Sequence, residues 1–135
     1  MTACASQKPM ITPEQFINTE WRLSEWEQNG RLQKFPRTIS LQLMGEEDGS
    51  LRASGHTGCN RYFGSASFEN GKLTVGPVSM TRMACPDESS NRYEVAFLKL
   101  LEGPLSVSIN NSHMQLASSN EVLVFEKNHT RSLSD

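Results

Sequence analysis

Hydrophobic and polar residues alternate with a period of two along most of the chain. The alternation is clearest at residues 20–24 and 38–43, where every second side chain is apolar. This pattern is typical of a β-strand with one buried face. We place Gly30 and Pro36 in a loop between these two strands, because both residues interrupt regular structure.

Short turn motifs separate the remaining alternating segments. Asp48-Gly49 and Asn70-Gly71 are dipeptides that favour tight hairpin turns. We therefore expect further strands near residues 51–53, 62–68, 73–75, 78–83, 105–109, 114–116 and 122–125, with other turns at Asn110-Asn111 and Ser119-Asn120.

Only one long segment of the sequence has the spacing of apolar residues that is typical of an α-helix. Apolar side chains stand at i, i+3, i+4, i+7 and i+8 from Tyr93 to Leu101, which predicts the principal helix within residues 90–102. Asn91 with Glu94 is the expected cap, and Gly103-Pro104 ends the helix. Near the N-terminus, Thr12-Pro13-Glu14-Gln15 favours one short helical turn.

These elements predict a mainly β (α+β) fold, namely an antiparallel barrel-like meander of about seven to nine short strands with one principal α-helix before the last three. Trp26 and Phe63 are expected among the core aromatic residues. The expected core also contains Trp21, Leu23, Ile39, Leu41, Leu43, Tyr62, Phe68, Leu73, Val75, Phe97, Leu101, Val107, Leu116 and Val124.

Composition narrows the function classes. A chain of 135 residues fits one domain, which we place at 12–127 between a tether at 1–11 and a polar tail at 128–135. The net charge of −2 and the scattered basic residues argue against binding to nucleic acid. No apolar run approaches the roughly 20 residues that span a bilayer.

The first residues resemble the end of a bacterial lipoprotein signal. Small residues precede Cys4, although the chain does not contain the apolar stretch of such signals. We expect Cys4 to be lipidated and to attach the domain to a membrane. The chain as it stands, without that apolar segment, is expected to be soluble. The alternative is an ordinary N-terminus that contains a cysteine.

Several motifs together resemble a known family. They are GCNRY at 58–62, LT at 73–74, GP at 76–77, MTRMAC at 80–85, and Glu94 followed by FL at 97–98. From about residue 12 to 126 the chain resembles the META domain family, and within it the HslJ-type heat-shock lipoproteins. The resemblance implies a small barrel-like fold with one helix, a location facing the periplasm, and a role in stress or antibiotic tolerance without a known reaction.

The resemblance also suggests where the protein resides. We expect a lipoprotein on the periplasmic face of the bacterial outer membrane. Ala5 follows the candidate lipidated cysteine, whereas an Asp at that position retains lipoproteins in the inner membrane of well-studied enteric bacteria.

Cys59 and Cys85 lie 26 positions apart and leave Cys4 as the odd cysteine. In an exported protein such a pair most simply forms a disulfide, and the alternative is two buried, reduced thiols. A zinc site with His56 lacks a convincing fourth ligand. A catalytic Cys59 beside His56 lacks a placed orienting group other than Asn60. We therefore expect no catalytic residue, metal or cofactor.

The candidate surface of the family motifs consists of Asn60, Arg61, Thr81 and Arg82. For Asn60 and Gly58 we favour a structural role, since Gly permits positive φ and Asn satisfies backbone groups. Thr81 suits a strand because it is β-branched. Arg61 and Arg82 are either solvated strand charges or a positive patch that receives an acidic partner.

We expect a monomeric, non-enzymatic domain that binds an unknown envelope protein or component under stress. The alternative is a carrier that holds a small apolar molecule inside the barrel, since β-barrels can enclose such ligands.

Overall fold

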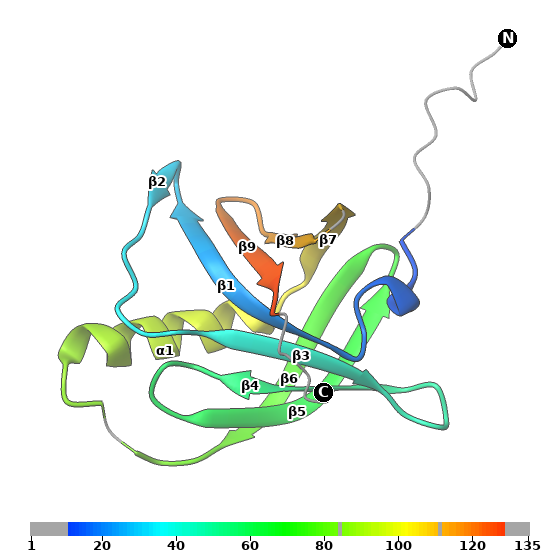
Figure 1. Cartoon of the computed structure of the whole chain (residues 1–135), viewed down its shortest axis with the longest axis horizontal. Helices are drawn as coiled ribbons and strands as arrows, with labels where there is room; N and C mark the ends of the chain where they lie inside the picture. The colour runs from blue at the N-terminus through cyan, green and yellow to red at the C-terminus, as the bar shows by residue number, and fades with distance from the viewer. Residues whose placement is uncertain (1–10, 84, 111, 129–135) are drawn as a thin grey trace, which may run out of the picture.

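The computed structural model describes residues 11–83, 85–110 and 112–128. In this part of the chain, nine strands and one α-helix follow a short 3₁₀ turn, Pro13–Gln15 (Figure 1). The strands are β1 Thr19–Gln28, β2 Arg31–Leu32, β3 Ser40–Gly45, β4 Leu51–His56, β5 Arg61–Glu69, β6 Lys72–Met80, β7 Leu105–Asn110, β8 His113–Ala117 and β9 Glu121–Lys127. Helix α1, Glu88–Leu101, precedes the last three strands, so the predicted mainly β class is confirmed.

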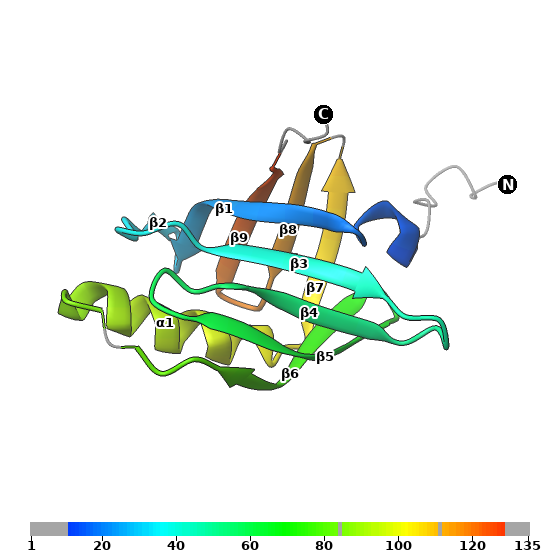
Figure 2. The same cartoon turned by 60° about the horizontal axis from the view of Figure 1, so that its bottom comes forward.

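The nine strands form one antiparallel sheet whose ends meet. Each strand from β3 to β9 pairs with the next along the chain, and β1 pairs with both β3 and β9. Strands β6 and β7 have the shortest pairing in the ring. They pair only at Lys72↔Ser106 and Leu73↔Leu105. Helix α1 lies on this side and contacts β6 (Figure 2). The helix therefore covers the side on which the strands separate.

The interior of the ring is filled by large side chains. Phe97 of α1 packs edge-on against Trp26 of β1 and Tyr62 of β5, with ring centroids 6.3 and 5.9 Å apart. The largest side chains with no more than 1% exposure are Trp21, Trp26, Tyr62, Phe16, Phe97 and Phe125. Burial of these apolar surfaces is the main stabilising contribution to such a fold.

A close backbone approach beside the start of β5 requires glycine at position 55. Tyr62 donates its phenolic hydrogen to the carbonyl of Ser40 at 2.8 Å. Gly55 lies in β4 between them, and a Cβ there would collide with the Ser40 carbonyl oxygen and lie 2.8 Å from the Tyr62 hydroxyl. A side chain at position 55 would therefore displace this buried hydrogen bond.

Strand boundaries differ from the expectation in two places. The segment taken as a loop contains β2, which is only Arg31–Leu32 and is too short for a period to be detected. The expected strands at 73–75 and 78–83 are one strand, β6, which ends at Met80. Its pairing with β5 shifts between Gly64 and Ala66, and Pro77 lies opposite this irregularity. Proline is tolerated there because the regular ladder is interrupted.

The expected helix cap was wrong. Helix α1 begins at Glu88, and its N-cap is Asp87, whose side chain accepts the Ser90 N–H at 2.9 Å. Asn91 and Glu94 lie inside the helix and bind other segments. The helix ends at Leu101, before Gly103-Pro104 as expected.

The predicted core was wrong at two positions, Phe63 and Val124. Phe63 is 47% exposed because Tyr62 faces inward and neighbouring strand residues face opposite sides. Val124 is only partly buried, whereas Phe68 is partly buried and packs edge-on against Phe16 of the core. On β9 the inward side chains are Leu123 and Phe125. Among the described residues, no helix has the length and apolarity to cross a membrane.

Candidate functional site: a buried clamp beneath an exposed arginine pair

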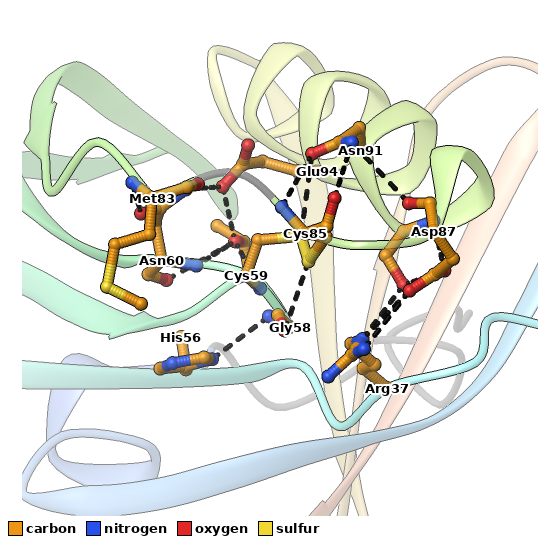
Figure 3. The surroundings of a disulfide bond; sticks show 12 residues. Arg37, His56, Gly58, Cys59, Asn60, Met83, Cys85, Asp87, Asn91 and Glu94 are labelled. Carbon is orange, nitrogen blue, oxygen red and sulfur yellow. Dashed lines mark hydrogen bonds and ion pairs between the residues drawn. A yellow bond between two sulfur atoms is a disulfide. The ribbon is translucent and has the colours of Figure 1, made fainter.

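Two motif-bearing segments meet beside helix α1. The segment 57–60 connects β4 to β5, and the segment from Thr81 to Asp87 leads from β6 into α1. A disulfide between Cys59 and Cys85 joins them, with 5.3 Å between the Cα atoms (Figure 3). Both cysteines are buried, at 6% and 8% exposure. The disulfide therefore fixes one segment against the other below the surface.

Asn60 lies at the centre of this junction and is only 3% exposed. Its Nδ2 donates to the Met83 carbonyl and to Glu94 Oε2, both at 2.8 Å. Its Oδ1 accepts the Met83 N–H at 2.6 Å and the Thr81 hydroxyl at 2.8 Å. Each donor and acceptor of the amide therefore has a partner within the protein, so Asn60 is not part of the surface that the sequence suggested.

Glu94 connects helix α1 to the same junction. Its Oε2 accepts the Thr57 hydroxyl at 2.6 Å as well as the Asn60 amide. Thr57 Oγ1 in turn accepts the backbone N–H groups of Cys59 and Asn60, at 3.2 and 2.9 Å. Thr57 is 1% and Glu94 6% exposed, and buried polar groups are costly unless they are bonded in this way. Thr57, Asn60 and Glu94 are called the polar clamp below.

The N-terminus of α1 is stabilised by hydrogen bonds to Asp87. Asp87 accepts the Ser90 hydroxyl at 2.5 Å and the Ser90 N–H at 2.9 Å, and Arg37 lies 3.1 Å from its second oxygen. The Ser90 hydroxyl is the largest influence that lowers the pKa of Asp87 to about 2, with the Ser90 N–H and Arg37 contributing. Asn91 accepts the Cys85 N–H at 3.3 Å. The segment before the helix is therefore bound to α1 at two residues, the N-cap Asp87 and Cys85.

This geometry does not favour catalysis by Cys59. Cys59 is bonded to Cys85 and is not a free nucleophile. His56 uses Nδ1 to accept the Gly58 N–H at 3.0 Å, so the ring serves the loop backbone. Within residues 11–83, 85–110 and 112–128, no three His, Cys, Asp or Glu side chains form a group suited to a metal ion.

Some motif residues direct their side chains to the buried junction, and others are exposed to solvent. Thr81 is exposed, but its hydroxyl donates to Asn60 and accepts the Arg61 N–H at 3.1 Å. Arg61 and Arg82 are exposed. In the described part of the chain neither takes part in an ion pair, in contrast to Arg22, Arg37 and Arg52. Cys4 lies outside the described residues.

The model of the META domain matches residues 14–130. The chain belongs to the META domain family. It is 29% identical over 130 residues to the heat shock protein HslJ of Escherichia coli K12, covering 93% of this chain and 86% of that protein.

Solved structures share the fold of this META domain. A protein from Burkholderia xenovorans, determined by NMR, has 30% identity and a TM-score of 0.69, with 92% of this chain and 97% of that chain covered. A second NMR structure has 27% identity and a TM-score of 0.62, covering 87% and 95% of the two chains. A DUF4847 family protein from Bacteroides vulgatus shares only the fold, at 12% identity and a TM-score of 0.56, over 85% and 96%.

Two residues of this META domain clamp were not identified from the sequence as partners. Thr57 precedes the GCN motif, and Glu94 was assigned to the helix cap. The available signal was the position of Glu94 on the buried stripe of α1, with Phe97 and Leu101 three and seven residues further on. An acidic residue on an apolar helix face requires a buried partner.

Proposed function

We propose that this META domain is a non-enzymatic binding module of the cell envelope that contributes to stress or antibiotic tolerance. The main support for the proposal is that some of the motif residues are buried and bonded to one another while others are exposed. The side chains of the polar clamp bind one another below the surface, whereas Arg61 and Arg82 of the same motifs remain exposed. A clamp that holds an exposed pair suits recognition, since rigid support lowers the entropy lost on binding.

The relatives support the stress part of the proposal. HslJ of Escherichia coli is named a heat shock protein and matches most of this chain. We further propose that Cys4 carries a lipid that holds the domain on the periplasmic face of the outer membrane, where it acts as a monomer. Its partner there is an envelope protein or another envelope component.

The carrier alternative has less support. Aromatic side chains fill the centre of the ring, and Trp21, Trp26 and Phe97 have no exposed surface. A cleft of about 320 Å³ lies outside this core, where the C-terminal end of α1 faces the β8–β9 turn. It is open to solvent and is lined by residues such as Leu100, Pro104 and Glu121. An apolar ligand would have to displace the packed core to enter the ring.

A stress-survival assay tests the binding module. The chromosomal gene is replaced by the double variant Arg61→Glu/Arg82→Glu, and survival is measured after heat and antibiotic exposure. We expect a loss of tolerance that approaches that of a gene deletion. The matched control is Arg31→Glu/Lys34→Glu, which makes the same charge change at exposed residues near β2.

Two results would count against this function. Wild-type tolerance of the arginine variant at normal protein levels would exclude the exposed pair as its site, and so would an equal loss in the control. Fractionation of the native gene product with and without Cys4→Ser separately tests the lipid anchor. Identical soluble behaviour of the two forms would contradict the anchor.

A further inference from the structure

The outer face of β4, β5 and β6 presents an aromatic residue beside a basic one. Arg61 and Phe63 are two residues apart on β5, so their side chains leave the same face of the sheet. Phe63 stands between Ser54 of β4 and Ser79 of β6 in the strand register. Because these flanking side chains are small, Phe63 rises above them and is 47% exposed.

The segment after β6 lies beside the start of β5. The Thr81 N–H donates to the Arg61 carbonyl at 3.0 Å, which sets Arg82 and Met83 directly beyond the start of β5. Met83 is 65% exposed, and its side chain points away from helix α1 (Figure 3). Asn60 binds both the N–H and the carbonyl of Met83. Arg61, Phe63, Arg82 and Met83 are called the arginine face below.

The arginine face is positively charged, whereas the whole chain has a negative net charge. The protein carries 15 acidic residues and a net charge of −2. By contrast, the register neighbours of the arginine face are serine, threonine and histidine, namely Ser54, His56, Ser79 and Thr81. Neither arginine is paired with a carboxylate among the described residues. Their charge is therefore available to an anion from outside the molecule.

The shape of the face discriminates between possible partners. An extended peptide docks in a groove or along a strand edge. Here the strands already pair on both sides of β5, and the apolar tips of Phe63 and Met83 project from a sheet face. Projecting apolar tips beside arginines suit a lipid headgroup layer, where the tips reach the acyl boundary and guanidinium groups bind phosphates.

We propose that the arginine face docks on an anionic phospholipid bilayer. This inference rests on the proposed binding function of Arg61 and Arg82 and specifies their partner. The overall negative charge does not prevent such contact, because charges more than about 8 Å from the surface are largely screened at physiological ionic strength. The two arginines and two apolar side chains then act at close range.

Vesicle sedimentation tests the proposal with the full chain carrying Cys4→Ser, so that no lipid anchor contributes to binding. The probes are vesicles of phosphatidylcholine alone and of phosphatidylcholine mixed equally with phosphatidylglycerol. We expect binding to the mixed vesicles only, decreasing as salt is added. Arg61→Glu/Arg82→Glu should lower the partition coefficient by about tenfold or more, since each basic residue near an anionic surface contributes about a factor of five. Phe63→Ser should lower it severalfold.

Matched controls lie on the other side of the ring. Arg31→Glu/Lys34→Glu repeats the charge change, and Leu32→Ser removes a side chain that is 65% exposed on β2. Both should bind as the wild type does, within about a factor of two for surface substitutions remote from the contact. Circular dichroism of all variants verifies that they are folded.

The proposal is overturned if the wild type does not bind the mixed vesicles, or if the control variants lose as much binding as the arginine-face variants. Soluble polyglutamate serves as a second probe. Binding to polyglutamate through the same residues, without binding to vesicles, would assign the face to an acidic protein instead. If vesicle binding fails while the arginine variant still loses stress tolerance in cells, the binding module stands and only its lipid partner is wrong.

Discussion

Asn60 Nδ2 donates a hydrogen bond to Glu94 Oε2 at 2.8 Å, across 34 positions of the chain. This single bond connects the start of β5 to the middle of helix α1. The same Glu94 oxygen also accepts the Thr57 hydroxyl. A carboxylate on the helix therefore holds the segment 57–60, and Asn60 in turn binds Met83 of the second segment.

Replacing Glu94 with Ala should lower the free energy of unfolding by about 2 to 4 kcal/mol. The substitution removes the carboxylate that accepts from the buried Thr57 hydroxyl and from one N–H of the Asn60 amide, and each buried polar group that loses its partner costs about 1 to 3 kcal/mol. Glu94→Gln retains an acceptor oxygen and should lose less. Urea unfolding measures both, with the exposed Glu69→Ala as the control expected to change by less than about 0.5 kcal/mol. Equal effects of Glu94→Ala and Glu69→Ala would show that the clamp is not a stabilising element.

Removal of the disulfide should destabilise the protein without unfolding it. The bond closes a loop of 26 positions, for which the chain-entropy model gives about 3.5 kcal/mol. Denaturant unfolding of Cys59→Ala/Cys85→Ala should show a loss of this order. Because Asn60 still binds both backbone groups of Met83, native-like near-ultraviolet dichroism should remain. Complete unfolding in the absence of denaturant would mean that the disulfide, not the clamp, holds the two segments together.

Acid should weaken the helix N-terminus through Asp87. Its pKa is about 2 in the folded protein, below the usual 3.8, mainly because the Ser90 hydroxyl binds the carboxylate. A lowered folded pKa contributes stability above the unfolded value, and that stability is lost as the pH falls through about 2. The difference in free energy of unfolding between wild type and Asp87→Asn should therefore change between pH 3.8 and about 2. Parallel acid titrations of the two proteins would contradict this role.

Alkali should unfold the protein through Tyr62. Burial raises the pKa of this phenol well above 10.0. A raised folded pKa means that its contribution to stability is complete below the unfolded value and is lost as the pH rises above it. Tyrosinate absorbance of Tyr62 should therefore appear together with the loss of tertiary structure, and Tyr62→Phe should delay that transition. The same variant should cost about 1 kcal/mol at neutral pH, because the Ser40 carbonyl loses its donor. Ionisation of Tyr62 in a still-folded protein would refute the coupling.

Much of the architecture followed from the two hydrophobic periods. The alternation at 20–24 and 38–43 marked β1 and β3, and the stripe from Tyr93 to Leu101 marked α1. Boundaries were less accessible, because β2 has two residues and Pro77 lies in a strand interrupted by an irregular register. Phe63 was misplaced because an apolar residue next to an inward tyrosine must face outward.

The junction was only partly predictable from sequence. The motifs drew attention to Asn60, Cys59 and Cys85, since they are unusual residues in an otherwise regular strand pattern. The bond between Thr57 and Glu94 was not predicted, because it depends on how the helix packs across the ring rather than on any local spacing. Exposure of Arg61 likewise became evident only once the inward and outward faces of β5 were known, and that of Arg82 only once β6 was seen to end at Met80.

The pairing of β1 with β9 affects how the chain can fold during synthesis. Trp21 pairs with Lys127 and Trp26 with Leu123, so the first strand and the last are direct neighbours. A nascent chain still missing its final strand therefore has an open edge along β1. Contacts this distant in sequence slow folding, because the loop between them must be ordered first. The domain accordingly completes its fold only once β9 is available, and until then the exposed edge of β1 is where chaperones would have the most to protect.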